Sequence, residues 1–186
     1  SSSVPNTGTE KIAPPAPTLL DWASGAGRMT HAIGKIGDIF SRLGIARLWK
    51  AKDDAGLSEH LIRLAEEAEE GSLTFANFVE FDTNFGHRRD VAGYARQLEW
   101  FDGVAGAFLS RLRSGDLAIF TADHGNDPTY RGTEHTRERV PVLCHGAGAG
   151  SVGGGGGASG TEARGGVGAR EGVTVDHDDR GRGRTR

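Results

Sequence analysis

The stretch LAIFTADHGND, residues 117–127, decides how this chain folds. It begins with a short apolar run, which is typical of a strand covered on both faces. Acidic and imidazole groups follow directly, at the point where that strand has to end. In a parallel sheet, functional groups gather beyond the carboxyl ends of the strands. The stretch therefore predicts a buried strand that carries Asp123 and His124 at one edge of a sheet.

On either side of this stretch, helical patterns alternate with strand patterns. Helices are expected over residues 19–24, 38–43, 55–70 and 91–113. Strands are expected over residues 28–33, 73–81, 117–121 and 140–144. Thr18 and Asp90 are placed to cap the first and the last helix, while His31 and Cys144 fall within strands and are expected to be structural. This order predicts an α/β fold, in which a parallel sheet has helices on both faces.

Composition divides the chain into three parts. Residues 1–17 are rich in Ser, Pro and Thr and are expected to be a linker. Residues 18–146 can bury a core. From Ser151 onward there is no Leu, Ile, Phe, Met, Trp or Tyr, so residues 147–186 are expected to be a low-complexity, disordered tail whose burial cannot offset its ordering entropy. There is no initiator methionine, and we expect a piece of a longer chain.

Charge and residue content exclude several classes of function. The net charge of −3 argues against general nucleic-acid binding. No apolar run approaches the roughly 18 residues of a membrane span. The single cysteine, Cys144, excludes an internal disulfide and fits a reducing, cytoplasmic compartment. The candidate catalytic and metal-binding residues are therefore expected among the polar clusters of residues 18–146.

Three such clusters lie at predicted strand ends or in loops: FDTNFGHRRD (81–90), TADHGND (121–127) and GTEHTR (132–137). Any one Asp–His pair is more often a turn or a cap than a metal site, but the three clusters together are more informative. Their candidate ligands are Asp82, His87, Asp123, His124 and His135. Asp and His without sulfur suit Mn²⁺, Zn²⁺ or Fe²⁺, and five ligands would nearly furnish two metals roughly 3.5–4 Å apart. Arg88 and Arg89 could bind phosphate or pair with nearby acids.

The same clusters, with VPV (140–142), PTLL (17–20) and IGKIGDIF (33–40), closely resemble phosphopentomutases of the alkaline phosphatase superfamily. The resemblance covers roughly residues 14 to 146. It implies interconversion of ribose 1-phosphate and ribose 5-phosphate, and of the deoxyribose pair, with two Mn²⁺ ions and a phosphorylated threonine. By the same resemblance, one metal is held by Asp82, His87 and His135, and the other by Asp123 and His124. Lys35 would contact the substrate phosphate.

The sequence also departs from the family pattern. The family's threonine nucleophile and a further metal-binding aspartate precede the matched region, and nothing in residues 1–17 resembles them, so no catalytic residue is assigned here. Residues 1–17 could be a remnant of the family's cap domain. Without a covalent acceptor, the mutase cycle cannot pass through the phosphoenzyme. Three hypotheses stay open: the C-terminal part of a phosphopentomutase; a cofactor-independent phosphoglycerate mutase-like enzyme or phosphatase; or a non-catalytic metal-binding fragment.

Overall fold

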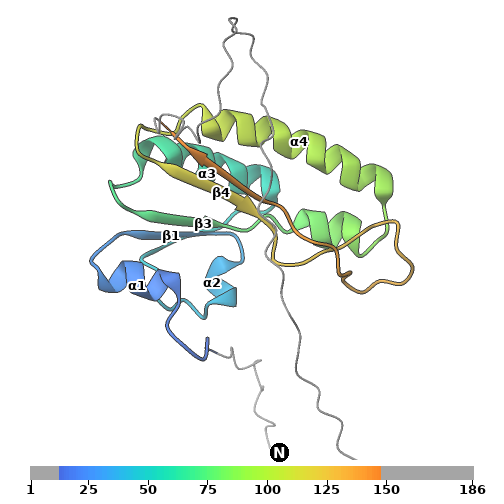
Figure 1. The fold of residues 1–186 in the computed structure, drawn as a ribbon, viewed down its shortest axis with the longest axis horizontal. Coiled ribbons are helices and arrows are strands. Elements are labelled where there is room, and N and C mark those ends of the chain that lie inside the picture. Colours follow the sequence, from blue (N-terminus) through green and yellow to red (C-terminus); the bar gives the residue numbers. More distant parts are fainter. Residues whose placement is uncertain (1–12, 148–186) are drawn as a thin grey trace, which may run out of the picture.

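A computed structural model describes residues 13–147 of the chain (Figure 1). Most of the predicted linker and nearly all of the predicted tail lie outside these residues. No helix in this part of the chain combines the length and the apolar character needed to cross a membrane. In chain order the elements are α1 (Leu19–Gly25), β1 (Thr30–Ile33), α2 (Ile36–Ile39), β2 (Arg47–Trp49), α3 (Asp54–Glu67), β3 (Leu73–Ala76), η1 (Phe81–Gly86), α4 (Val91–Leu109), β4 (Leu117–Thr121) and β5 (Val142–Gly146).

Three parallel strands form the first sheet, in the order β2–β1–β3. The central strand, β1, is buried along its whole length. In register, Ile33 of β1 lies opposite Trp49 of β2 and Ala76 of β3. Strands that are parallel and buried on both faces need cover on each side.

Helices provide that cover on both faces of the sheet (Figure 1). Because successive side chains of a strand point to opposite faces, Ala32 and Ile33 enter two different cores. Ala32 packs with Leu20 of α1 and Ile36 of α2. Ile33 packs with the apolar stripe of α3 and the residue after it, namely Leu57, Leu61, Leu64 and Ala68. The expected α/β class, with a parallel sheet between helices, is confirmed.

His31 has a structural position in β1, as expected. It is fully buried, and its Nδ1 accepts a hydrogen bond from the indole N–H of Trp49 at 3.2 Å. In the neutral ring Nε2 then carries the proton, which it donates to the carboxylate of Glu69 at 3.0 Å. Both ring nitrogens are satisfied, so this histidine ties β1 to β2 and to the segment that follows α3.

Some boundaries differ from the sequence expectations. β2 is not predicted, because its three residues include the exposed Arg47 and form no apolar run. β3 ends at Ala76 instead of continuing to Phe81, and the chain then enters η1, a short π-helix. The expected helix over 38–43 is the shorter α2, and Ser41 and Arg42 after it adopt positive φ angles.

The second sheet differs more. β4 and β5 pair with each other in antiparallel fashion and do not extend the parallel sheet. The reason is that the loop between them folds back on itself, with an antiparallel bridge between Gly125 and Thr136. The chain therefore reverses direction before it enters β5, which rules out parallel pairing with β4.

Only one face of this sheet is covered within the described residues. Phe120 of β4 packs edge-on against Phe101 and Phe108 of α4, with ring centroids 6.2 and 6.1 Å apart. On the opposite face Ile119 is 57% exposed, and its cross-strand partner Cys144 is exposed too. The expectations of a strand covered on both faces and of a core cysteine are therefore wrong for this part of the chain.

Candidate metal centre

Three segments far apart in sequence meet in one cluster of acid and imidazole groups. Asp82, in η1, is its centre: Oδ2 lies 3.2 Å from Nε2 of His87, and Oδ1 lies 3.4 Å from Nε2 of His135. His124, from the loop after β4, joins them. One ligand atom each from Asp82, His124 and His135 lie within 4.8 Å of one another. A single cation could therefore contact groups from all three segments.

Asp123, the fifth predicted ligand, lies at the rim of the cluster. Its Oδ1 is 3.6 Å from Nε2 of His124, and its side chain is 69% exposed. The predicted ligands fall into two sets, with Asp82 and His135 on one metal and His124 on the other. The three closely grouped residues do not follow this assignment, because they include members of both sets. The structure thus brings the five side chains into one neighbourhood and does not separate them into two sets.

The backbone of η1 places Asp82 beside His87. The N–H of His87 donates to the carbonyl oxygen of Asp82 at 2.9 Å, and the N–H of Asp90 donates to that of Phe85 at 3.0 Å. Each of these hydrogen bonds spans five residues, the spacing of a π-helix, which is frequent at functional sites. Asp82 therefore lies in a widened helical turn, and the expectation that it ends a strand is wrong. Asp90 then caps α4, as expected, by accepting from the N–H of Gly93.

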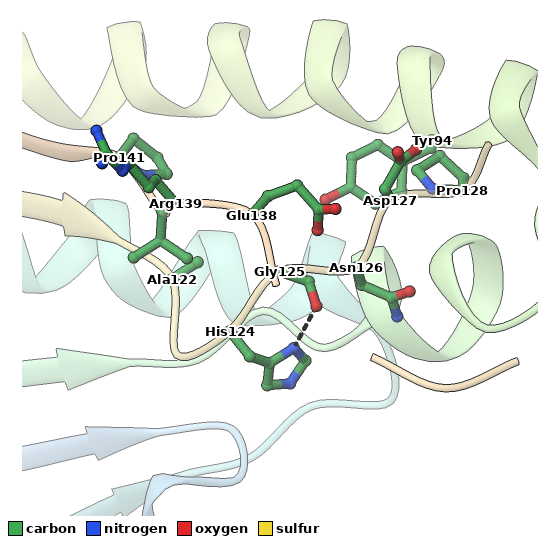
Figure 2. Close-up of a pocket in the computed structure, with 11 residues that line it drawn as sticks. Tyr94, Ala122, His124, Gly125, Asn126, Asp127, Pro128, Glu138, Arg139 and Pro141 are labelled. Atoms are coloured by element: carbon green, nitrogen blue, oxygen red, sulfur yellow. Dashed lines mark hydrogen bonds between the residues drawn. The ribbon is translucent and has the colours of Figure 1, made fainter. Parts of the chain in front are cut away.

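Backbone carbonyls fix the protons of two histidines. Nδ1 of His87 lies 2.5 Å from the carbonyl oxygen of Thr133. Nδ1 of His124 lies 3.2 Å from that of Gly125, as the dashed line in Figure 2 shows. A carbonyl oxygen can only accept, so each Nδ1 must be the donor, and in a neutral ring Nε2 keeps a free lone pair. Metal-binding histidines usually donate their second N–H to a carbonyl or carboxylate in this way.

The free lone pair of His87 points at another acceptor. Its Nε2 faces Oδ2 of Asp82 at 3.2 Å, and two acceptors cannot form a hydrogen bond without a proton or a metal ion between them. The rings of His124 and His135 stack with centroids 3.6 Å apart and planes 21° from parallel. A carboxylate among imidazole rings is a donor set that suits a divalent transition metal.

Asn126 is not among the residues predicted from the sequence, yet it lies between Arg89 and Asp82 and forms a hydrogen bond with each. Its side-chain amide donates to Oδ1 of Asp82 at 2.5 Å, and the residue is only 9% exposed. Asn126 belongs to the quoted cluster TADHGND, but an asparagine next to Asp-His-Gly carries no signal that separates it from an ordinary loop residue.

Arg89 also differs from expectation, because it binds neither an acid nor an open phosphate site. Its Nε and both terminal nitrogens donate to the backbone carbonyls of Gly86, Asp127, Gly132 and Glu134 and to the side-chain oxygen of Asn126. Its φ angle is +55°, a left-handed conformation that costs a non-glycine residue about 1–2 kcal/mol. Such a conformation persists where the surroundings over-determine it, as these hydrogen bonds do.

Asp54, at the start of α3, anchors the chain just before η1. It is 1% exposed and accepts from the backbone N–H groups of Val79 and Glu80, each at 3.1 Å. Burial disfavours the charged carboxylate and raises the pKa of Asp54 to about 6. This acid therefore fixes the entry to the π-helical turn that carries Asp82.

Among the described residues, one cavity lies beside the start of η1 and another lies against the cluster. The first, of about 350 Å³, is lined by Lys35, Lys50, Lys52 and acidic residues that include Asp54 and Glu80. Lys35 lies at the start of α2 and is exposed, so its ammonium group is accessible from this cavity.

The other cavity, of about 220 Å³, lies against the loop that carries His124 (Figure 2). Tyr94 and Glu138 are among the residues that line it. Burial raises the pKa of the Tyr94 hydroxyl, and the nearby charge of Asp82 adds to this effect. A Cβ at Gly125 would lie 2.6 Å from the carboxylate of Glu138, so the backbone passes close to this acid only because glycine has no side chain.

Comparison with known proteins adds to this geometry. A family model described as the Metalloenzyme superfamily matches residues 31–168. The chain is 58% identical over 135 residues to a phosphopentomutase of Sinorhizobium fredii, and 56% identical over 135 residues to one of Rhizobium meliloti; each match covers 73% of this chain and 33% of the relative. It is 52% identical over 151 residues to a phosphopentomutase of Rhizobium leguminosarum bv. trifolii, covering 80% of this chain and 37% of the relative. The chain thus spans about a third of the length of the curated relatives it matches.

Proposed function

Because this chain belongs to the Metalloenzyme superfamily, we propose that it is the metal-binding part of a phosphopentomutase. The proposed reaction interconverts ribose 1-phosphate and ribose 5-phosphate, and the corresponding deoxyribose phosphates. Identity above 50% to phosphopentomutases over most of this chain supports that reaction class over a phosphoglycerate mutase.

The observation that carries the proposal is the approach of Nε2 of His87 to Oδ2 of Asp82, at 3.2 Å, in a cluster that also contains His124 and His135. A hydrogen bond to the Thr133 carbonyl keeps the ring proton of His87 on the far side. A second N–H held by a backbone carbonyl is the usual environment of a metal-binding histidine, and this supports the proposal.

In the proposed centre, Asp82, His87 and His135 hold one Mn²⁺ ion, and Asp123 and His124 hold a second. The bound metals would supply positive charge that stabilises a transferring phosphoryl group. The protein's own contribution is to orient the imidazoles of His87 and His124, since the Nδ1 atom of each lies against a backbone carbonyl.

The proposed substrate is a pentose phosphate, with Lys35 as the residue that contacts its phosphate. Lys35 is exposed and lines the cavity of about 350 Å³. Glu80, directly before η1, lines the same cavity. Arg89 is not part of this subsite, because backbone carbonyls and Asn126 already occupy its donors. A cytoplasmic location is part of the same proposal and fits a chain with a single cysteine.

A chimeric enzyme tests the reaction. The matched third of the Sinorhizobium fredii phosphopentomutase is replaced by the corresponding residues of this chain, and conversion of ribose 1-phosphate is measured with and without Mn²⁺. Metal-dependent turnover is expected, with loss on Asp82→Asn and retention in Asp102→Asn, a change at an exposed position of α4. A folded chimera that binds Mn²⁺ without turnover would contradict the proposed activity. Turnover of 3-phosphoglycerate would favour a related mutase instead.

A further inference from the structure

We propose that Asn126 and Arg89 are positioning residues for the metal centre, and that together they fix the orientation in which the carboxylate of Asp82 faces His87 and His135. The proposal rests on the metal site proposed above and extends it to two residues that bind no metal. Its basis is a chain of hydrogen bonds from Arg89 through Asn126 to Asp82.

The two neighbours of Asn126 fix the orientation of its side-chain amide. On one side Nη1 of Arg89 donates to Oδ1 of Asn126 at 2.7 Å; on the other, Nδ2 donates to Oδ1 of Asp82 at 2.5 Å. A guanidinium can only donate and an ionised carboxylate can only accept. Rotating the amide by 180° would set donor against donor and acceptor against acceptor, so only the observed orientation is stable.

Both functional atoms of the Asn126 amide are therefore engaged, and its oxygen is not free to bind a metal. The amide donates to Oδ1 of Asp82, the oxygen that also lies 3.4 Å from Nε2 of His135, and Oδ2 faces Nε2 of His87 at 3.2 Å. A short hydrogen bond to a carboxylate also restricts the rotation of that carboxylate. Asn126 thus holds Asp82 in the orientation in which one oxygen and an imidazole nitrogen face the same point.

Arg89 holds the three segments of the site in register. Through backbone carbonyls it contacts the end of η1 at Gly86, the loop after β4 at Asp127, and the loop that carries His135 at Gly132 and Glu134. These acceptors are neutral carbonyl groups, and the positive charge of Arg89 also polarises the Asn126 amide towards Asp82. One guanidinium therefore both joins the loops and strengthens the hydrogen bond that orients Asp82.

The test compares Asn126→Leu with the intact 186-residue chain. Leucine has a similar volume but forms neither hydrogen bond. Mn²⁺ affinity is measured by calorimetry, and the visible absorption of the Co²⁺-loaded protein reports the ligand geometry. Loss of a residue that orients a metal ligand typically weakens metal binding about 10- to 100-fold, and that weakening is expected here together with an altered Co²⁺ spectrum. The matched control is Asn84→Ala, which removes another amide–carboxylate hydrogen bond, to Glu80 at 3.1 Å, and should change neither measurement.

The outcomes separate the two proposals. If the intact chain binds neither Mn²⁺ nor Co²⁺, the metal site itself is wrong. If it binds them and the leucine variant binds within twofold with the same Co²⁺ spectrum, the positioning role is overturned, whatever happens to the melting temperature of the metal-free protein. If the leucine variant does not fold, Arg89→Lys decides by the same two measurements. Lysine keeps the charge but cannot reach the carbonyls and Asn126 at once.

Discussion

Gly86 makes room for Asn126. A Cβ atom at Gly86 would lie 2.4 Å from Nδ2 of Asn126 and 2.7 Å from its Cγ, distances at which one group must move. Gly86 is buried in η1, and the asparagine amide occupies the space that a side chain at position 86 would need. The π-helical turn and the loop after β4 therefore approach each other as closely as they do because residue 86 has no side chain.

The substitution Gly86→Ala should displace Asn126 and weaken the hold on Asp82. We expect Mn²⁺ affinity to fall about tenfold or more, and the free energy of unfolding to fall by about 1–3 kcal/mol because of overpacking. Calorimetry and urea unfolding measure the two effects. The control is Gly103→Ala in α4, where an added Cβ meets nothing within 4 Å and should stabilise the helix by about 0.5–1 kcal/mol. Unchanged Mn²⁺ affinity in the Gly86 variant would show that the close contact does not matter for the site.

Asp54 should make the protein less stable as the pH rises from about 4 to 6. Burial raises its pKa in the folded state from 3.8 to about 6, so the folded protein retains a proton there that the unfolded chain releases. The stabilisation from that proton is complete below pH 4 and is lost as the pH passes 6. A shift of this size corresponds to about 3 kcal/mol.

The variant Asp54→Asn isolates this effect, because all other titrating groups are common to both proteins. Relative to the native chain, the variant should gain up to about 3 kcal/mol between pH 4 and pH 7.5. It should be destabilised at the lower pH, since an amide accepts from only one of the two backbone N–H groups at Val79 and Glu80. Urea unfolding at the two pH values measures the difference. If the free energies of unfolding of the two proteins change by the same amount between the two pH values, Asp54 has the same pKa in the folded and unfolded states.

Opposite faces of β4 should respond differently to substitution. Phe120→Ala removes a ring that packs against Phe101 and Phe108, and should cost about 2 kcal/mol or more. Ile119→Thr, on the exposed face, should change the free energy of unfolding by less than about 0.5 kcal/mol. Urea unfolding of both variants checks this. A large loss at Ile119 would show that something covers this face in solution.

Sequence patterns predict the parts of the fold that depend on local periodicity. The apolar stripe of α3 and the caps at Thr18 and Asp90 require only neighbouring residues. The structure has α3, and it places Thr18 at the N-cap of α1 and Asp90 at the N-cap of α4. The antiparallel pairing of β4 and β5 depends instead on how the loop folds back between Gly125 and Thr136. No short-range pattern encodes that reversal.

The same distinction applies to the candidate site. Asp82 and His87 are close in sequence, and their residue types alone suggest metal binding. Asn126 and Arg89 gain their roles mainly from contacts across 37 and more positions, with each other and with backbone carbonyls that have no sequence signature. Arginine chemistry alone suggests a phosphate ligand, and it is the saturation of the guanidinium by carbonyls that rules this out.

Metal should stabilise the chain through His87 and not through His60. At a Mn²⁺ concentration about 100 times the dissociation constant, binding to the folded state alone adds about 2.7 kcal/mol. We expect a melting temperature several degrees higher with Mn²⁺ than after chelation with EDTA, and we expect His87→Gln to lose most of that gain, because glutamine offers no imidazole lone pair opposite Asp82.

His60 is the matched control, since its Nε2 also lies near a backbone carbonyl, that of Lys50, at 3.3 Å. Its other nitrogen faces Nη2 of Arg63 at 3.3 Å, so its lone pair is already used by a donor, and within residues 13–147 no ion pair joins it to a carboxylate. His60→Gln can lower the melting temperature but should keep the full gain from Mn²⁺. An equal loss of that gain in both variants would mean that Mn²⁺ stabilises the protein by general charge screening, and the lone pair of His87 would then have no special role.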